Sequence, residues 1–111
     1  MTPRELFTFA ARLRTRLSGE ALNDHIDTIL KRLRLIPCQN TVIGGYNRKG
    51  LSGGERKRTS IGYEMLAEPE LLVLDEPTSG LDSVTSLTIL ELMKREAIQS
   101  QKAVIMTIHQ P

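Results

Sequence analysis

The sequence predicts an α/β fold in which a helical segment is followed by a parallel βαβ unit. Apolar residues recur at helical spacing through the first part of the chain. Two continuous apolar runs of strand length, LLVLD at 71–75 and AVIMTI at 103–108, then flank a further helical pattern. Continuous apolar runs are typical of parallel strands that are buried on both faces, so we expect both faces of this sheet to be covered.

The first helix is predicted to begin after Thr2, whose hydroxyl can cap it. Pro3 suits the first helical position, and Glu5 completes a Thr-x-x-Glu capping box. Ser18 and Gly19 then interrupt the helical pattern. The apolar stripe expected to face the core consists of Leu6, Phe9, Ala10, Leu13 and Leu17.

A second helix is predicted from about Glu20 to Arg34, because one of its faces is apolar and the other charged. Pro37 ends it. Residues 38–50 are rich in glycine and asparagine and are expected to form a loop. The apolar face of the second helix contains Leu22, Ile26, Ile29, Leu30 and Leu33.

A third helix is predicted over about 53–67, and a fourth, over about 84–97, joins the two strands. The order strand, helix, strand predicts parallel strands joined by a right-handed crossover. The carboxyl ends of parallel strands meet at one edge of the sheet, where open α/β sheets bind their ligands. We therefore expect Asp75 and Glu76, after the first strand, to share that edge with His109, after the second.

Composition argues against several classes of function. The 111 residues carry a net charge of +2, too small to indicate nucleic-acid binding, and no aromatic residues are interleaved with the basic ones to stack on bases. Cys38 is the single cysteine, so no internal disulfide can form. No segment approaches the roughly 20 apolar residues that span a bilayer. We expect any membrane role to depend on a part outside this sequence.

The stretch LSGGE places Ser52, Gly53, Gly54 and Glu55 at the start of the third helix. Unpaired backbone N–H groups at a helix start carry partial positive charge, and glycines let a phosphate approach them closely. The Ser52 hydroxyl could donate to the same phosphate. An ordinary Ser-x-x-Glu capping box also explains these residues and is the preferred interpretation when they are taken alone, while the phosphate-binding interpretation stays open.

Asp75 and Glu76 follow a buried strand, where a carboxylate needs a cation or hydrogen-bond donors. Aspartate suits Mg²⁺, and the adjacent glutamate could activate a water molecule as general base. The alternative is an acidic turn before Pro77. His109 could donate to a phosphate or hold a water molecule, or could simply be a histidine at a strand end.

In their order, these motifs resemble the C-terminal half of the nucleotide-binding domain of ATP-binding-cassette (ABC) transporters, a P-loop NTPase-type ATPase fold. The stretches GGERKRTSIG, DEPTSGLDS and TIHQP are similar to the G subfamily, the White-type half-transporters. The resemblance implies a signature motif at Ser52, Gly53, Gly54 and Glu55, a Walker B magnesium ligand at Asp75, a catalytic glutamate at Glu76, a D-loop at Ser79, Gly80, Leu81 and Asp82, and a switch histidine at His109.

The resemblance also implies the organisation and partners of the chain. About residues 1–67 correspond to the helical and signature subdomain, and about 68–111 to the Walker B, D-loop and histidine part of the ATPase core. ATP and Mg²⁺ are the implied cofactors. A second nucleotide-binding domain and a transmembrane domain, the latter absent from this sequence, are the implied partners, with no nucleic acid. The implied location is the cytoplasmic face of a membrane.

Two departures from the family are clear. The sequence contains no Gly-Lys pair, hence no Walker A loop, and no Q-loop glutamine in place. In the family, ATP lies between two domains, and the Walker motifs of one face the signature motif of the other. Without a Walker A loop, Asp75 and Glu76 present negative charge to ATP, which is itself a polyanion. We expect the chain alone to bind ATP weakly or not at all, and not to hydrolyse it.

The leading hypothesis is therefore a fragment or truncated product of a transporter's ATPase subunit, and two alternatives remain. One is a truncated, non-catalytic partner that offers only its signature face to a full half-transporter. The other is a soluble ABC ATPase of translation or DNA repair, which GGERKRTSIG and TIHQP fit poorly. If the two strands belong to a larger sheet, the isolated chain should also expose apolar surface and be poorly soluble.

Overall fold

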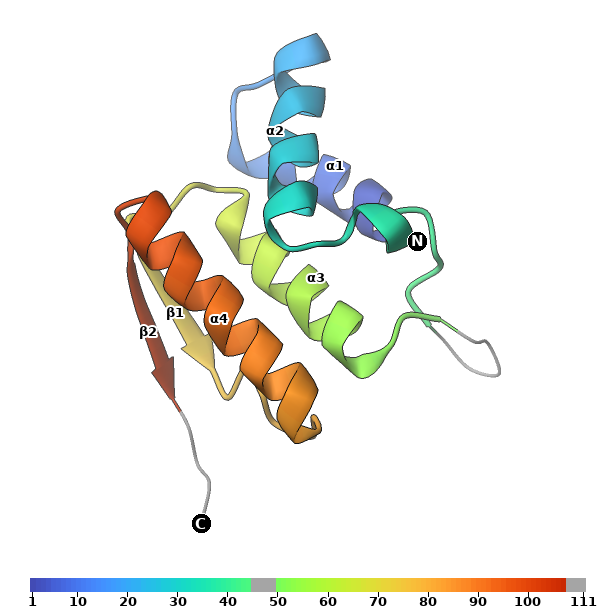
Figure 1. Cartoon of the computed structure of the whole chain (residues 1–111). Helices are drawn as coiled ribbons and strands as arrows, with labels where there is room; N and C mark the ends of the chain where they lie inside the picture. Colours follow the sequence, from blue (N-terminus) through green and yellow to red (C-terminus); the bar gives the residue numbers. More distant parts are fainter. Residues whose placement is uncertain (45–49, 108–111) are drawn as a thin grey trace.

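The computed structural model of the chain describes residues 1–44 and 50–107, so His109 and part of the predicted loop at 38–50 lie outside the described residues. The described elements occur in the predicted order, which confirms an α/β fold with a βαβ unit after a helical segment (Figure 1). They are α1 (Pro3–Arg14), α2 (Gly19–Arg32), the 3₁₀ helix η1 (Ile36–Cys38), α3 (Gly53–Met65), β1 (Leu71–Asp75), α4 (Ser83–Gln99) and β2 (Ala103–Thr107).

The two strands pair in parallel, as predicted. Leu71 lies opposite Ala103 at one end of the ladder, and Asp75 lies opposite Thr107 at the other. The carboxyl ends of both strands therefore meet at one edge of the sheet, and the residues that follow β1 emerge there.

The predicted capping box of α1 is confirmed, but its predicted apolar stripe is partly wrong. The Thr2 side chain accepts a hydrogen bond from the Glu5 backbone at 3.2 Å, and Glu5 accepts one from the Thr2 backbone at 3.1 Å. Phe9, Leu13 and Leu17, which the stripe places in the core, are 54%, 67% and 39% exposed. The buried residues of α1 are Pro3, Phe7, Ala10 and Ala11.

The rotation of α1 follows from its packing against α3. A Cβ atom placed on Gly62 would overlap the ring of Phe7 and would lie 2.8 Å from Cδ1 of Leu33. Gly62 thus leaves a space on α3 that a ring from α1 and a leucine after α2 fill together. Because Phe7 turns toward this space, Phe9 turns away from it.

The predicted apolar face of α2 is confirmed, since all five of its expected core residues are buried. Helix α3 occupies the centre of the molecule: it contacts α1 and α2 on one side, and β1 and α4 on the other (Figure 1). A single cluster of buried side chains runs through all of these elements. The helical segment and the βαβ unit therefore share one hydrophobic core.

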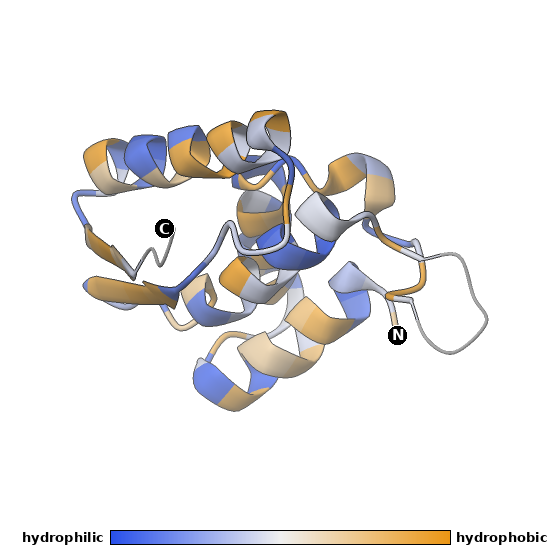
Figure 2. Ribbon diagram, turned by 90° about the horizontal axis from the view of Figure 1, so that it is seen from below, coloured by the Kyte–Doolittle hydropathy of each residue, from blue (hydrophilic) through white to orange (hydrophobic). Residues whose placement is uncertain are grey.

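The expectation that both strands are buried on both faces is wrong for the described part of the chain. Leu72 and Leu74 of β1 are buried, whereas the alternate residues face solvent. Val73 and its cross-strand partner Ile105 are 59% and 52% exposed. The reason is that α3 packs against β1 and α4 against β2, while no described element covers the opposite face. Figure 2 shows both strands largely in the orange of hydrophobic residues.

We expect the paired substitutions Val73→Thr and Ile105→Thr to reduce self-association of the chain, because they remove the paired apolar side chains from the uncovered face. Threonine keeps the β-branched shape that strands favour, so stability should change by less than about 1 kcal/mol. Dynamic light scattering over a concentration series and urea unfolding measure the two effects. As the matched control, Leu72→Thr on the covered face should cost at least about 2 kcal/mol. Unchanged scattering by the double variant would contradict the prediction.

Candidate functional site

Two consecutive acidic residues lie at the carboxyl edge of the sheet, and one threonine bonds to the carboxylate of the first and to the backbone of the second. Asp75 is the last residue of β1, and the hydroxyl of Thr107 donates to its Oδ1 at 2.6 Å. The backbone N–H of Glu76 donates to the carbonyl of Thr107 at 3.0 Å and to its hydroxyl oxygen at 3.1 Å. Sequence reasoning missed Thr107, although the strand register, which places residue 107 opposite residue 75, is the signal that could have found it.

The backbone turns sharply directly after Asp75. Glu76 has φ of +46° and Gly80 has φ of +76°, both in the left-handed region. Two turns follow each other: the N–H of Ser79 donates to the carbonyl of Glu76 at 3.1 Å, and that of Leu81 donates to Thr78 at 3.2 Å. The chain after β1 is thereby folded back to the start of α4.

Asp82 ends this turn and caps α4. Its carboxylate accepts a hydrogen bond from the backbone N–H of Thr85 at 3.4 Å. The hydrogen bonds from Thr85 hold the pKa of Asp82 below its usual range. Asp82 is therefore a negatively charged N-cap, which interacts favourably with the positive end of the dipole of α4.

Ser52 caps α3 in the same way, and the capping box predicted for it is confirmed. Its hydroxyl oxygen accepts from the Glu55 backbone at 3.2 Å, while the Glu55 carboxylate accepts from the Ser52 backbone at 2.9 Å. That second bond is the main reason why the pKa of Glu55 lies below its ordinary value.

The capping box leaves donors at this helix start. The hydroxyl of Ser52 acts in it as an acceptor, so its own hydrogen remains available. Among the described residues, no backbone acceptor pairs with the N–H of Gly53 or Gly54. The cap and an anion-binding role can therefore coexist in these residues.

The starts of α3 and α4 are packed against each other. A Cβ atom on Gly53 would lie 3.0 Å from Cδ2 of Leu81, and one on Gly54 would lie 2.5 Å from Cγ2 of Thr85. An open groove of about 340 Å³ runs along this junction, lined by Gly53, Arg56, Lys57, Ser60, Ser79, Gly80 and Leu81. The sequence placed these two segments on separate elements and did not predict their contact.

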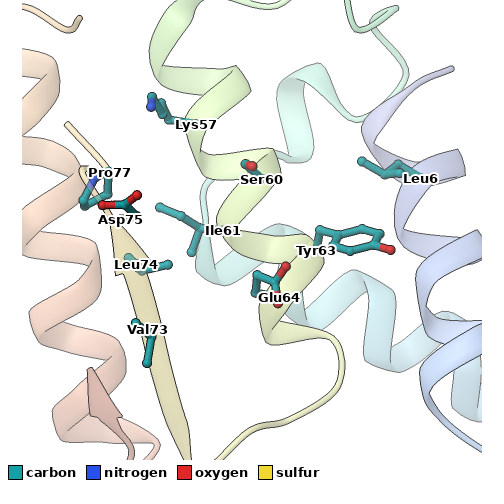
Figure 3. A pocket seen from close by; sticks show the side chains of 10 residues that line it. All are labelled: Leu6, Lys57, Ser60, Ile61, Tyr63, Glu64, Val73, Leu74, Asp75 and Pro77. Carbon is teal, nitrogen blue, oxygen red and sulfur yellow. The ribbon is translucent and has the colours of Figure 1, made fainter. Parts of the chain in front are cut away.

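A second cavity, of about 320 Å³, lies between α3 and the end of β1. Figure 3 shows Asp75 and Pro77 on one of its walls and Ile61 and Ser60, from α3, on another. The full lining is Leu6, Lys57, Ser60, Ile61, Tyr63, Glu64, Val73, Leu74, Asp75 and Pro77. Lys57 lines both cavities, so one basic side chain borders both the sheet edge and the junction of α3 with α4.

Comparison with known proteins identifies the family. Residues 2–79 match the family model described as ABC transporter. The chain belongs to the ABC transporter family. It is 49% identical to ABC transporter G family member 22 of Arabidopsis thaliana over all of this chain and 15% of the relative's length. It is 45% identical to the broad substrate specificity ATP-binding cassette transporter ABCG2 of Mus musculus, over all of this chain and 17% of that protein.

An uncharacterized ABC transporter ATP-binding protein/permease of Saccharomyces cerevisiae is 44% identical to the whole chain, which covers 9% of its length. The chain thus spans less than a fifth of each of these relatives. These matches confirm the resemblance to an ABC transporter of the G type. No helix in the described residues is long and apolar enough to cross a membrane.

In this ABC transporter chain, the carboxylates at the sheet edge fit Mg²⁺ bound together with a nucleotide. Asp75 is exposed and offers a hard oxygen donor. Within residues 1–44 and 50–107, no three His, Cys, Asp or Glu side chains are grouped to enclose a metal ion. Mg²⁺ commonly takes one or two carboxylates and fills its remaining positions with phosphate oxygens and water, which is what this edge allows.

The tight contact between the starts of α3 and α4 predicts a rescue experiment. Gly54→Ala should destabilise the chain by about 1–3 kcal/mol, because its methyl group collides with Cγ2 of Thr85. Thr85→Ser removes that methyl group, so the double variant Gly54→Ala, Thr85→Ser should recover most of the loss. Urea unfolding of the parent, both single variants and the double variant measures this coupling. Equal losses with and without Thr85→Ser would contradict the predicted contact.

The capping box of α3 predicts a dependence of stability on pH. Because its folded-state pKa is depressed, Glu55 contributes stability above its unfolded pKa of about 4.3 and loses it as pH falls through the folded value. We expect the free energy of unfolding to decline below about pH 4. Glu55→Gln can keep the hydrogen bond but does not titrate, so it should flatten this decline. Urea unfolding between about pH 3 and pH 6 tests this, and a variant profile parallel to that of the parent would refute it.

Proposed function

We propose that this chain is part of the ATP-binding and ATP-hydrolysing subunit of a G-type ABC transporter, which couples ATP hydrolysis to movement of a substrate across a membrane. The observation that carries the proposal is the arrangement at the sheet edge, where Thr107 hydrogen-bonds to the carboxylate of Asp75 and to the backbone of Glu76. The G-type relatives support the same interpretation, since their names describe transporters. These names favour a transporter subunit over a soluble ABC ATPase.

In this proposal the two carboxylates have different roles. Asp75 would hold Mg²⁺, and the bound ion would supply positive charge to neutralise the nucleotide phosphates. Glu76 accepts a proton from the attacking water molecule as general base. The left-handed backbone at Glu76 directs the chain away from β1 directly after the metal ligand. His109, outside the described residues, is proposed as the switch histidine that contacts the terminal phosphate.

The signature residues act on a second nucleotide. Ser52, Gly53 and Gly54 present a hydroxyl and backbone N–H groups at the positive end of α3, and they are proposed to bind ATP held by a second nucleotide-binding domain. Glu55 keeps that helix start in place through its bond to Ser52. The D-loop residues, from Ser79 to Asp82, lie beside the same helix start, so they are proposed to link the two sites.

The division of the chain follows from these roles. About residues 1–67 are proposed as the helical and signature subdomain, and about 68–111 as part of the ATPase core. Because the sequence contains no Gly-Lys pair, the Walker A loop of the site at Asp75 and Glu76 must come from outside these residues. The complete unit would bind a transmembrane domain at the cytoplasmic face of the membrane, and the chain alone would not hydrolyse ATP.

Glu76→Gln, in a complete transporter subunit that carries this sequence, should lower ATP hydrolysis by about 10²–10⁴-fold while bound ATP is retained. Glutamine keeps the size of the side chain and cannot accept the proton. Phosphate release and retention of labelled nucleotide measure the two quantities. The matched control is Glu70→Gln, an exposed glutamate directly before the other end of β1, which should leave both unchanged. Normal turnover by Glu76→Gln would remove Glu76 from the role of general base.

A further inference from the structure

We infer that Thr107 is a positioning residue that orients the proposed metal-binding carboxylate of Asp75 and the backbone of the proposed catalytic residue Glu76, an inference that rests on the proposed function. Thr107 ends β2, directly opposite Asp75 in the parallel ladder. Its hydroxyl donates to Asp75 Oδ1 at 2.6 Å and accepts the Glu76 N–H at 3.1 Å. One side-chain oxygen therefore contacts two successive residues of the proposed site.

The bond to Asp75 determines which carboxylate oxygen is available to a cation. The hydroxyl has one hydrogen, which is directed to Oδ1. Among the described residues, no other side-chain hydrogen bond to this carboxylate is present. Since Asp75 is exposed, its side chain would otherwise rotate among several rotamers. Thr107 selects one of them through its bond to Oδ1, and no described side chain donates a hydrogen bond to Oδ2.

The bond to Glu76 acts on the backbone. Glu76 has φ of +46°, a conformation that costs a residue with a side chain roughly 1–2 kcal/mol. Its N–H is shared between the carbonyl and the hydroxyl of Thr107, at 3.0 and 3.1 Å. These two bonds fix the orientation of the peptide between Asp75 and Glu76. They thereby also fix the direction in which the Glu76 side chain leaves the sheet.

Mg²⁺ binding should be sensitive to this arrangement. The ion demands nearly ideal octahedral geometry, so an aspartate that is free to rotate is a poorer ligand than one held in place. Partners that hydrogen-bond a metal ligand typically contribute 10–100-fold in metal affinity, although they never touch the metal. Thr107 is such a partner of Asp75, because its hydroxyl donates a hydrogen bond to the proposed metal ligand.

The test compares Thr107→Val with Thr107→Ser in a complete transporter subunit that carries this sequence. Valine matches the shape of threonine and suits a strand, but it lacks the hydroxyl, whereas serine keeps it. Mn²⁺ is titrated against the subunit holding a non-hydrolysable ATP analogue, and free Mn²⁺ is followed by electron paramagnetic resonance. We expect Thr107→Val to weaken Mn²⁺ binding about 10–100-fold and Thr107→Ser to bind within about threefold of the parent. Amide hydrogen exchange at Glu76, measured without metal, should accelerate only in Thr107→Val.

Asp75→Asn separates this inference from the proposed function. If Asp75→Asn weakens Mn²⁺ binding strongly while Thr107→Val binds like the parent, the positioning role of Thr107 is refuted and the metal site stands. If Asp75→Asn has no effect, the proposed metal ligand itself is wrong. A loss in Thr107→Ser equal to that in Thr107→Val would also overturn the inference, because it would show that the strand, and not the hydroxyl, is needed. Urea unfolding confirms that each variant is folded.

Discussion

The rest of the structure depends on one constraint, which is that position 62 is a glycine and has no side chain. It lets Phe7 from α1 and Leu33 from the end of α2 reach the backbone of α3. On its other side, the same helix packs against β1 and α4. Two structural units that would otherwise need separate cores therefore share one, and the Ser52 end of α3 is held in a defined position relative to the sheet.

Local features of the fold could be predicted from the sequence because their causes are local. Both capping boxes involve residues three positions apart, and the parallel pairing follows from the order of the elements. The core face of α1 could not be predicted in this way. Phe7 and Phe9 are equally apolar, and the choice between them depends on Gly62, which is far away in the sequence. The half-exposed strands have a similar explanation, because an apolar run does not reveal whether an element covers each of its faces.

The features of the candidate site also differ in whether they could be predicted from the sequence. The order of LSGGE, LLVLDEP and SGLD is enough to indicate the ABC transporter family, because each stretch is contiguous in the chain. The contact of Gly54 with Thr85 and the two hydrogen bonds of the Thr107 hydroxyl join residues about 30 positions apart. Only the pairing of β1 with β2 and the packing of α3 on α4 bring them together. The sequence therefore indicates which residues could act, and the fold indicates which of them act together.

The close approach of α3 to its neighbours at both Gly62 and Gly54 has a mechanical consequence. The two glycines are eight residues apart on one helix, a separation of roughly 12 Å at 1.5 Å per residue. Because a helix is stiff, a tilt of α3 about its close contact at Gly62 would be carried along the helix to the contact at Gly54. A tilt of about 5° at Gly62 would shift the Gly54 end by about 1 Å, which is enough to disturb hydrogen-bond geometry. A small rotation of the α1 and α2 pair that tilts α3 would therefore also displace Ser52, Gly53 and Gly54, with no change in the helix itself.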